Sequence, residues 1–426
     1  MVHYCPGVIR GLFLVYALAV PSISRAQSQL TFSARREPPP RPSSRNPCHR
    51  SQKLPRAIIY NRHRMNDQKA KPAGIKEIAT ALGISIGTVD RALHGRSGVS
   101  EKTRTKVLKM VDSLNYRPNL AARSLKLNRR LRIAVHLPEQ IASFFDPLRN
   151  GIRAAAAAAH GLTVDLEFRT FPRLGEGDAE LLQKDLSHEY DGIILTPGDP
   201  AVIEPLIRRF TQRGTAVICV ASDAPRTDRI AGISVDGTAS GGIAAELLSR
   251  TIQKEGHVAT ITGSLSTLDH SEKLRGFAAT LATLAPHLSL IPAIESHERP
   301  KEAYQAACNL LNRRPRPSGI YISTANSLPV LRALEEHKCL DKMQIITTDL
   351  FPELVPFIEA GKILATIYQR PFTQGKSAFE TLVQYLLEGI RPESSTRLAP
   401  HIVLRSNLFL FTNYLADSGD INTTAG

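Results

Sequence analysis

The stretch IKEIATALGISIGTVDRAL, residues 75–93, predicts two short amphipathic helices joined by a turn. Its first half repeats apolar residues at spacings i, i+3, i+4 and i+7, the stripe that a helix buries: Ile75, Ile78, Ala79 and Leu82. Gly83 supplies the turn, and Ser85 is a favoured N-cap for the second helix. Val89, Ala92 and Leu93 are expected to face the first helix.

A third, longer helix is predicted to begin at Glu101, after the N-cap Ser100. A carboxylate in the first turn suits the positive end of the helix dipole. The residues expected on its inner face are Val107, Leu108, Val111 and Leu114. Two short helices joined by a glycine turn and backed by a third describe a helix-turn-helix domain, a common reader of duplex DNA.

The positive charge of the chain lies in its first third. The 426 residues carry 54 Lys and Arg against 39 Asp and Glu, a formal net charge of +15. Residues 1–64 contribute 11 basic and 1 acidic side chain, residues 65–130 contribute 14 and 5, and the rest contribute 29 and 33. The three regions therefore carry +10, +9 and −4, which indicates a nucleic-acid-binding module in front of a mildly acidic body.

Residues 1–64 allow three interpretations. GLFLVYALAV behind Arg10 resembles a secretory signal, although the run is short for a membrane span. The Pro-, Ser- and Arg-rich stretch that follows fits a disordered basic leader. The interpretation that we favour is a start at Met65, directly before the first helix.

The sequence from Ile75 to Lys126 resembles the DNA-binding domain of the lactose/galactose-repressor (LacI/GalR) family. The frame IA..LGIS..TV.RAL.G...VS..TR..V carries the resemblance. It implies that the second helix enters the major groove and that residues 117–130 form a hinge helix and linker. The DNA contacts it implies are Ser85, Ile86, Gly87, Thr88 and Arg91, with Asn119, Ala122, Leu125 and Lys126 in the hinge. Asp90, where the family often has Ser, and Gly74 depart from the pattern.

Residues 131–415 alternate short apolar strands with helical stretches, the rhythm of parallel doubly wound sheets. Their number suits two such sheets in tandem. Ligands of open α/β sheets bind beyond the carboxyl ends of the strands, so we expect a site between two lobes. The predicted fold is therefore α/β, with an all-α N-terminal domain and a two-lobed body.

This body resembles the periplasmic-binding-protein-like effector domain of the ribose type, with its matching motifs at strand ends. The resemblance implies an effector site made by Phe144, Phe145, Asp223, His270, Lys273, Asn326, Asp349 and Gln369. Lys273 stands where many relatives have Arg, Ala221 where many have Asp, and Ser327 where an acid is frequent. Six of these residues also have a structural alternative: core packing for the phenylalanines, helix caps for the aspartates, a loop role for His270 and a solvated helix surface for Lys273.

The residues predict a sequence-specific transcriptional regulator, a repressor, that binds duplex operator DNA and whose operator binding is controlled allosterically by a small sugar or sugar-like effector. No nucleophile elbow, phosphate-binding loop or metal-ligand spacing is present, so we expect no enzyme, cofactor or metal site. We expect a cytoplasmic homodimer without membrane association, and buried free thiols for its scattered cysteines. The predicted domains are 1–64, 65–116, 117–130, 131–415 and the tail 416–426. The alternative is an exported sugar-binding protein of a transport system.

Overall fold

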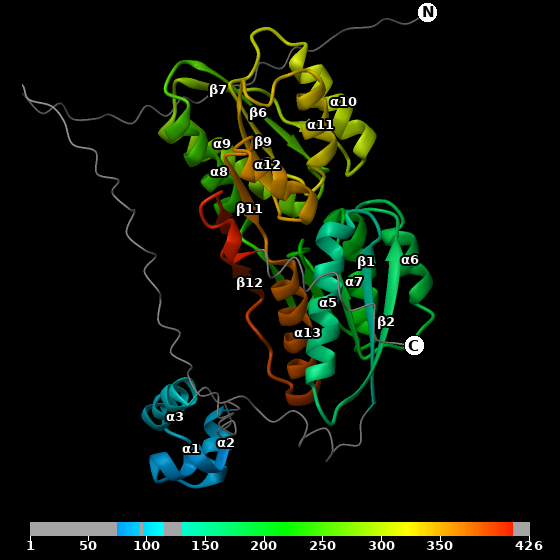
Figure 1. Ribbon diagram of the computed structural model, residues 1–426. Helices are drawn as coiled ribbons and strands as arrows, with labels where there is room; N and C mark the ends of the chain where they lie inside the picture. Colours follow the sequence, from blue (N-terminus) through cyan, green and yellow to red (C-terminus); the bar gives the residue numbers. More distant parts are fainter. Residues whose placement is uncertain (1–74, 94–96, 115–129, 412–426) are drawn as a thin grey trace, which may run out of the picture. The chain divides into compact units, whose positions relative to one another are not determined.

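The computed structural model describes residues 75–93, 97–114 and 130–411 (Figure 1). The leader 1–64, the hinge positions Asn119, Ala122, Leu125 and Lys126, and the tail 416–426 lie outside the described residues. In the described ranges, no helix has both the length and the apolar character needed to cross a bilayer.

The N-terminal domain consists of α1 (Ile75–Leu82), α2 (Ile86–Leu93) and α3 (Glu101–Ser113). Gly83 turns the chain with a φ of 64°, a conformation that glycine adopts without steric cost. Ser100 caps α3 by accepting a hydrogen bond from the Thr103 backbone at 3.2 Å. The buried residues of the three helices form one small core: Ile78, Ala79, Val89, Ala92 and Val107. The predicted helices and their inward faces on α1 and α2 are confirmed.

The predicted inner face of α3 was partly wrong. Val107 is fully buried, but Leu108 is 45% exposed and Leu114 is 37% exposed. Met110 and Val111 pack against the core. Because successive residues of a helix are rotated by about 100°, the face centred on Val107 continues through positions three and four residues later and leaves its neighbour at the side.

The first lobe of the body is a six-stranded sheet whose neighbouring strands are all parallel. Its order is β12-β5-β4-β3-β1-β2. The strands are β1 (Arg130–Pro138), β2 (Thr163–Phe171), β3 (Gly192–Leu195), β4 (Ala216–Val220), β5 (Ala231–Val235) and β12 (Ser395–Leu398). Helices α5 (Ala142–Ala158) and α13 (Pro371–Glu388) pack on one face, and α6 (Asp178–Asp185) and α7 (Pro200–Gln212) pack on the other. Alternate residues of β1 enter the two cores, as the period of a strand requires.

The second lobe is a seven-stranded sheet of order β13-β11-β10-β9-β6-β7, in which β8 also pairs with β6. Only β13 runs antiparallel to its neighbour. The strands are β6 (Gly256–Thr262), β7 (Leu288–Leu290), β8 (Ile294–Glu295), β9 (Gly319–Ile322), β10 (Gln344–Thr348), β11 (Ala365–Tyr368) and β13 (His401–Val403). The two parallel-dominated sheets confirm the predicted fold class.

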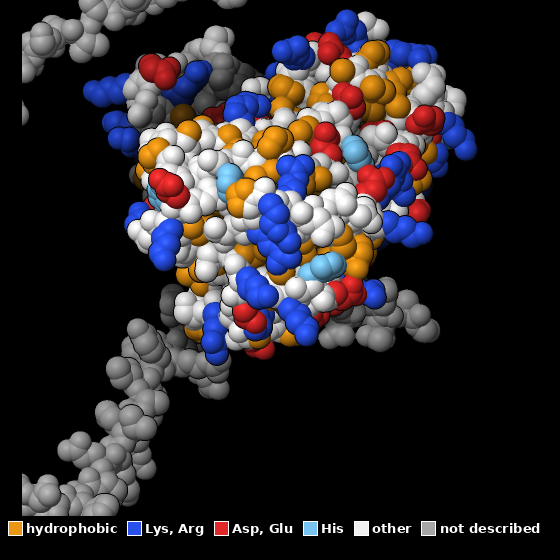
Figure 2. Space-filling model, turned by 90° about the horizontal axis from the view of Figure 1, so that it is seen from above, with side chains coloured by type: hydrophobic (Ala, Val, Ile, Leu, Met, Phe, Trp, Pro, Cys, Tyr) orange, Lys and Arg blue, Asp and Glu red, His pale blue; other side chains and the backbone are white. Residues whose placement is uncertain are grey.

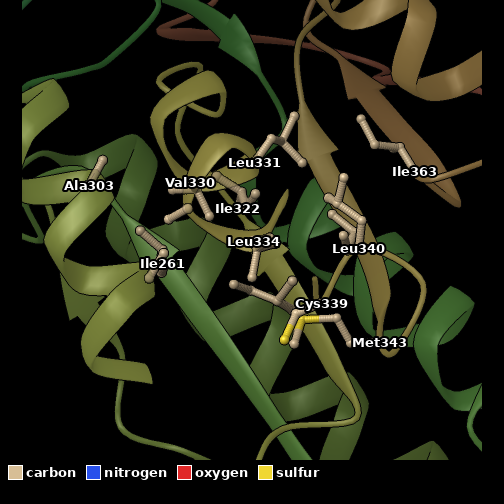
Figure 3. Close-up of a cluster of buried hydrophobic side chains, with 14 of the residues drawn as sticks. Ile261, Ala303, Ile322, Val330, Leu331, Leu334, Cys339, Leu340, Met343 and Ile363 are labelled. Carbon is tan, nitrogen blue, oxygen red and sulfur yellow. The ribbon is translucent and has the colours of Figure 1, made fainter. Parts of the chain in front are cut away.

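Helices cover both faces of the second sheet. Helices α8 (Gly237–Thr251) and α9 (Leu268–Leu284) lie on one face. Helices α10 (Pro300–Leu311), α11 (Leu328–Glu336) and α12 (Val355–Glu359) lie on the other. Figure 3 shows this second core, where Leu331 and Leu334 of α11 meet Ile261 of β6 and Ile322 of β9. The short 3₁₀ turns η1 (Pro352–Leu354) and η2 (Leu408–Leu410) complete the lobe.

Within residues 130–411 the chain passes between the lobes three times: from β5 to α8, from β11 to α13 and from β12 to β13. Each connection is only one or two residues long. Two helix pairs pack so closely that glycine is required at the contact. A Cβ on Gly151 of α5 would lie 2.0 Å from the Phe372 carbonyl oxygen of α13, and one on Gly276 of α9 would lie 2.0 Å from the Thr238 oxygen of α8.

Charges are spread over the body. On the face shown in Figure 2, basic and acidic side chains are interspersed and do not gather into one large patch. This distribution matches the small net charge of the region after residue 130, which carries 29 basic and 33 acidic residues. The basic excess of the chain therefore belongs to its N-terminal third.

Candidate DNA interface and ligand cavity

Helix α2 presents a polar and solvent-exposed start. The Ser85 hydroxyl accepts a hydrogen bond from the Thr88 backbone at 3.1 Å and lies 2.8 Å from the Thr88 hydroxyl, which makes it the N-cap predicted from the sequence. The backbone N–H groups at such a helix start form a favourable site for a phosphate.

The outer face of α2 carries the residues predicted to reach the bases. Ile86 is 47% exposed, although an isoleucine in a small domain usually enters the core. Gly87 and Arg91 are exposed as well, whereas Thr88 and Asp90 are half-buried. Ile86 can contact a thymine methyl group, Gly87 permits close backbone approach, and Arg91 supplies a guanidinium for a base edge.

A cavity that is partly open to solvent lies between the two lobes. Its lining comes from segments that follow the carboxyl ends of strands, where the doubly wound architecture builds its sites. The first lobe contributes Ile141, Phe144, Phe145, Leu174, Thr196, Ala221 and Ser222. The second lobe contributes Thr267, Asp269, His270, Lys273, Glu298, Thr324, Ala325, Asp349 and Gln369.

Lys273 forms an internal ion pair on α9. Its Nζ lies 2.6 Å from Asp269 Oδ2, one helical turn away, and its side chain is 1% exposed. Burial pulls the pKa of Lys273 down, but the charges of Asp269 and Asp349 outweigh burial, so its pKa is raised. The ammonium group therefore stays protonated, and the alternative of a solvated surface lysine is wrong.

His270 and Glu298 form a second buried pair. The imidazole Nε2 lies 2.7 Å from Glu298 Oε1, and both side chains are less than one-tenth exposed. The other carboxylate oxygen accepts a hydrogen bond from Thr324 at 2.8 Å. Burial alone would raise the pKa of Glu298. His270 and Thr324 lower it by more than burial raises it, so the pKa lies below its ordinary value. The glutamate is thus an anion held by two partners.

Asp349 follows β10 and receives two hydrogen bonds from Gln369. The Gln369 side chain donates at 2.7 Å and its backbone N–H donates at 3.1 Å. Gln374 fixes Gln369 in turn, donating to its carbonyl oxygen at 2.7 Å. Burial raises the pKa of Asp349 to about 6, against the opposing effects of Lys273 and Gln369.

The backbone around the cavity is strained at five non-glycine residues. Ile141, Ala221, Glu298, Asp349 and Arg370 have φ values of 59°, 65°, 56°, 68° and 58°. This left-handed region is disfavoured for residues with a Cβ, and most strongly for a β-branched residue such as Ile141. Four of these five residues line the cavity. Strain of this kind concentrates at functional sites.

Six of the eight predicted effector residues line the cavity: Phe144, Phe145, His270, Lys273, Asp349 and Gln369. The two phenylalanine rings belong to the first turn of α5 and meet edge to face, with centroids 4.9 Å apart. Their contacts to a ligand stay a prediction.

Asp223 and Asn326 lie outside the lining. Both carboxylate oxygens of Asp223 accept hydrogen bonds from Arg229, and both side chains are 4% exposed. Gly232 leaves the space for this pair, since a Cβ there would lie 2.3 Å from the Asp223 carboxyl carbon. The Asn326 backbone donates to Thr324, and its side-chain Nδ2 is buried without a hydrogen-bond partner among the described residues.

Sequence reasoning did not find Asp269, Glu298, Thr196 or Ser222. Asp269 precedes Lys273 by four residues on α9, the spacing of a helical ion pair, so a local signal existed for it. Glu298 lies 28 positions beyond His270 in a loop, where no periodicity marks it. Its pairing with His270 arises only when β6 and β8 bring the two segments together.

Three buried polar atoms of the lining have neither a hydrogen-bond nor an ion-pair partner within the described part of the chain: Thr196 Oγ1, Ser222 Oγ and His270 Nδ1. Glu298 Oε1 makes no hydrogen bond there either, but it lies 2.7 Å from His270 Nε2 in the ion pair described above. A buried polar atom without a partner is rare in folded proteins and is usually satisfied by water or a ligand. Among the described residues, no group of three His, Cys, Asp or Glu side chains could hold a metal ion.

Comparison with known families and proteins matches both parts of the chain. Residues 74–119 match the model of bacterial regulatory proteins of the lacI family, and residues 133–389 match the periplasmic binding protein domain. The chain belongs to the LacI/GalR family. It is 24% identical over 342 residues to the HTH-type transcriptional repressor PurR of Vibrio parahaemolyticus, covering 79% of this chain and 98% of the relative.

A second repressor and a solved structure also match the chain. The ribose operon repressor of Haemophilus influenzae is 25% identical over 346 residues, covering 79% of this chain and 99% of that protein. The crystal structure of GanP, a glucose-galactose binding protein from Geobacillus stearothermophilus, has a TM-score of 0.61 and 24% identity. It covers 66% of this chain and 99% of its own, and shows that the two-lobed body has the fold of a solute-binding protein.

Proposed function

We propose that this LacI/GalR chain is a DNA-binding transcriptional repressor whose operator affinity is controlled by a small sugar-like effector. The observation that carries the proposal is a helix-turn-helix with an exposed reading face on the same chain as a cavity lined by unpartnered buried polar atoms. The work of the protein is then binding and not catalysis. Its relatives named above are repressors.

On the DNA side, α2 is the recognition helix. Ser85 and Thr88 hold phosphates at the helix start, while Ile86, Gly87 and Arg91 meet base edges in the major groove. Because Ile86 and Gly87 offer no side-chain hydrogen bond, base-specific hydrogen bonding falls mainly to Arg91. The hinge residues Asn119, Ala122, Leu125 and Lys126 would continue the contact into the minor groove, where Leu125 acts as an apolar wedge.

On the effector side, a polyhydroxylated ligand would bond to groups from both lobes. Thr196 and Ser222 belong to the first lobe, and His270 belongs to the second. A ligand that binds residues of both lobes favours one relative position of the lobes, which are joined by three short connections. Coupling of this kind between a ligand site and DNA binding typically amounts to about 1–3 kcal/mol. We favour release of DNA on effector binding.

The DNA-bound form is a homodimer in the cytoplasm. Helix-turn-helix proteins read two half-sites about one helical turn apart, so a two-fold operator matches a two-fold protein. The paired hinge segments of two chains would meet at the centre of such an operator.

Selection of duplexes from a random pool by the full-length chain tests this function. We expect enrichment of a two-fold symmetric sequence, binding that weakens steeply with salt, and a 5- to 150-fold change in affinity when a bound sugar is present. Sugar binding without any sequence-selective, salt-sensitive duplex binding would refute the proposal and favour an exported sugar-binding protein.

A further inference from the structure

The cavity has one apolar wall. Ile141, Phe144, Phe145, Leu174, Ala221 and Ala325 line it and also belong to a single cluster of contacting hydrophobic residues. Five of these six come from the first lobe, and the other two residues that this lobe contributes, Thr196 and Ser222, carry only hydroxyl groups. The first lobe therefore offers a ligand an apolar surface and two hydroxyl partners, but no charge.

The opposite wall is charged, and each of its charged groups already has a partner within the protein. Lys273 is bound to Asp269, and His270 is bound to Glu298. Asp349 is held by Gln369. Three carboxylates against one lysine leave the lining at −2 with His270 neutral, or at −1 with His270 protonated. Among the described lining residues there is no arginine, the side chain that best binds phosphate or carboxylate groups through two parallel hydrogen bonds.

Two residues of the apolar wall have a strained backbone. Ile141 and Ala221 present their side chains from left-handed backbone, at φ values of 59° and 65°. Asn or Gly would adopt this conformation with less strain, and Asn would also offer a polar group to the cavity. The chain instead places apolar side chains at both positions, in the loops after β1 and β4.

We propose that the effector is an uncharged polyhydroxy compound with a methyl or similar apolar group, such as a deoxy sugar, and not a phosphorylated or carboxylated one. The hydroxyl-bearing edge faces the second lobe, where carboxylate oxygens and His270 Nδ1 are available, and the apolar group faces the wall around Ile141 and Ala221. This inference rests on the proposed function and names the chemical class of its effector.

An anionic effector is disfavoured by the charge of the lining. It would approach three carboxylates, and Lys273, the only lysine among the described lining residues, would have to leave Asp269 to meet it. A hydroxyl group against the apolar wall would in turn lose its hydrogen bonds to water without replacement. The first penalty weakens the binding of an anionic ligand, and the second weakens the binding of a ligand that places a hydroxyl group against the wall.

Matched sugar series test the proposal by thermal shift and calorimetric titration of the full chain. One series is D-galactose, its 6-deoxy form D-fucose and D-galactose 6-phosphate; the others are the corresponding forms of D-glucose and D-ribose. In the series that contains the right hydroxyl arrangement, we expect the deoxy form to bind about tenfold or more tightly than the parent sugar. The phosphate is expected to bind at least tenfold more weakly than the parent.

Other outcomes separate the two proposals. If a phosphorylated member binds most tightly, or if parent sugars bind as well as their deoxy forms, the inference is overturned while a sugar effector stands. If no member of any series binds, the sugar effector of the proposed function fails together with the inference.

Two variants test the wall itself. Ile141→Asn and Ala221→Asn place a polar side chain where left-handed backbone suits it, so the relief of backbone strain offsets the lost apolar packing. We therefore expect little change in melting temperature but about tenfold weaker binding of the deoxy sugar. Lys338→Asn is a matched control, because Lys338 is exposed, has a φ of 54° and does not line the cavity. It should leave binding unchanged. Unchanged binding in both wall variants would refute the apolar wall.

Discussion

Asp349→Asn should stabilise the protein at neutral pH. Asp349 is 2% exposed, and burial raises the pKa of its carboxyl group to about 6 from its ordinary value of 3.8. An acid with a raised pKa binds its proton more tightly in the folded state, so the folded state loses stability as pH rises through this range. Asn keeps the shape, carries no charge and tolerates the left-handed φ of 68° at this position.

The size of the effect follows from the shift. A change from 3.8 to about 6 corresponds to roughly 3 kcal/mol at pH 7.5, and about 2 kcal/mol of this develops between pH 4.5 and 7.5. Unfolding residues 130–411 involves an entropy of about 0.6 kcal/mol/K, so 2 kcal/mol is a shift of about 3–4 °C in Tm. Between pH 4.5 and 7.5, the stability of the variant relative to the native chain should therefore increase by this amount.

Denaturant unfolding of both proteins at several pH values from 4.5 to 7.5 measures the difference. Taking the difference between the two proteins cancels the titration of all other groups. Asp341→Asn provides the background change for an exposed position, since that carboxylate is 75% exposed and pairs with Lys362 at 2.5 Å. If the stability gain of Asp349→Asn does not grow with pH, the carboxyl group is not destabilised by burial and the reasoning is wrong.

Three further changes test the DNA-binding domain and the helix packing. Arg91→Ala should weaken binding to the selected duplex by about 1–3 kcal/mol and broaden its sequence preference, as measured against a panel of single-base variants. Ser85→Ala removes the cap of α2 and should lower the stability of the domain by about 1 kcal/mol in thermal unfolding. Gly276→Ala forces α9 away from the Thr238 carbonyl of α8 and should lower the stability of the body by about 1–3 kcal/mol or more; an unchanged Tm would contradict the observed close approach.

Local patterns predicted the N-terminal domain almost completely. Helix starts at Ile86 and Glu101 follow from Ser85 and Ser100, because capping is a contact between residues two or three positions apart. The error at Leu108 arose because the burial of this residue depends on contacts that are not local. A run of apolar residues on a helix shows that one face is buried but not which of two adjacent residues lies at its centre, since neighbouring helices decide this.

The cavity was predictable only in part. Lys273 and Asp349 were found because they lie in motifs at strand ends. The partners of their side chains were not predicted. Lys273 was expected to meet a ligand or solvent, and it is instead buried against Asp269. Asp223 was expected to bind hydroxyl groups, and the structure gives it Arg229 as its partner. The position of a residue at the end of a strand predicts that its side chain lies near the site. It does not predict which charged residue of the protein forms an ion pair with it.

The sequence by itself determined the order of domains, the two parallel sheets and the solvent-exposed face of α2, because these depend on periodicity, capping and charge along neighbouring residues. Only the tertiary structure decided the character of the cavity. The pairing of His270 with Glu298, the apolar wall and the strained φ values of Ile141 and Ala221 all join segments far apart in the chain. Such contacts form when strands from distant parts of the sequence end at the same edge of a sheet, and no local pattern encodes them.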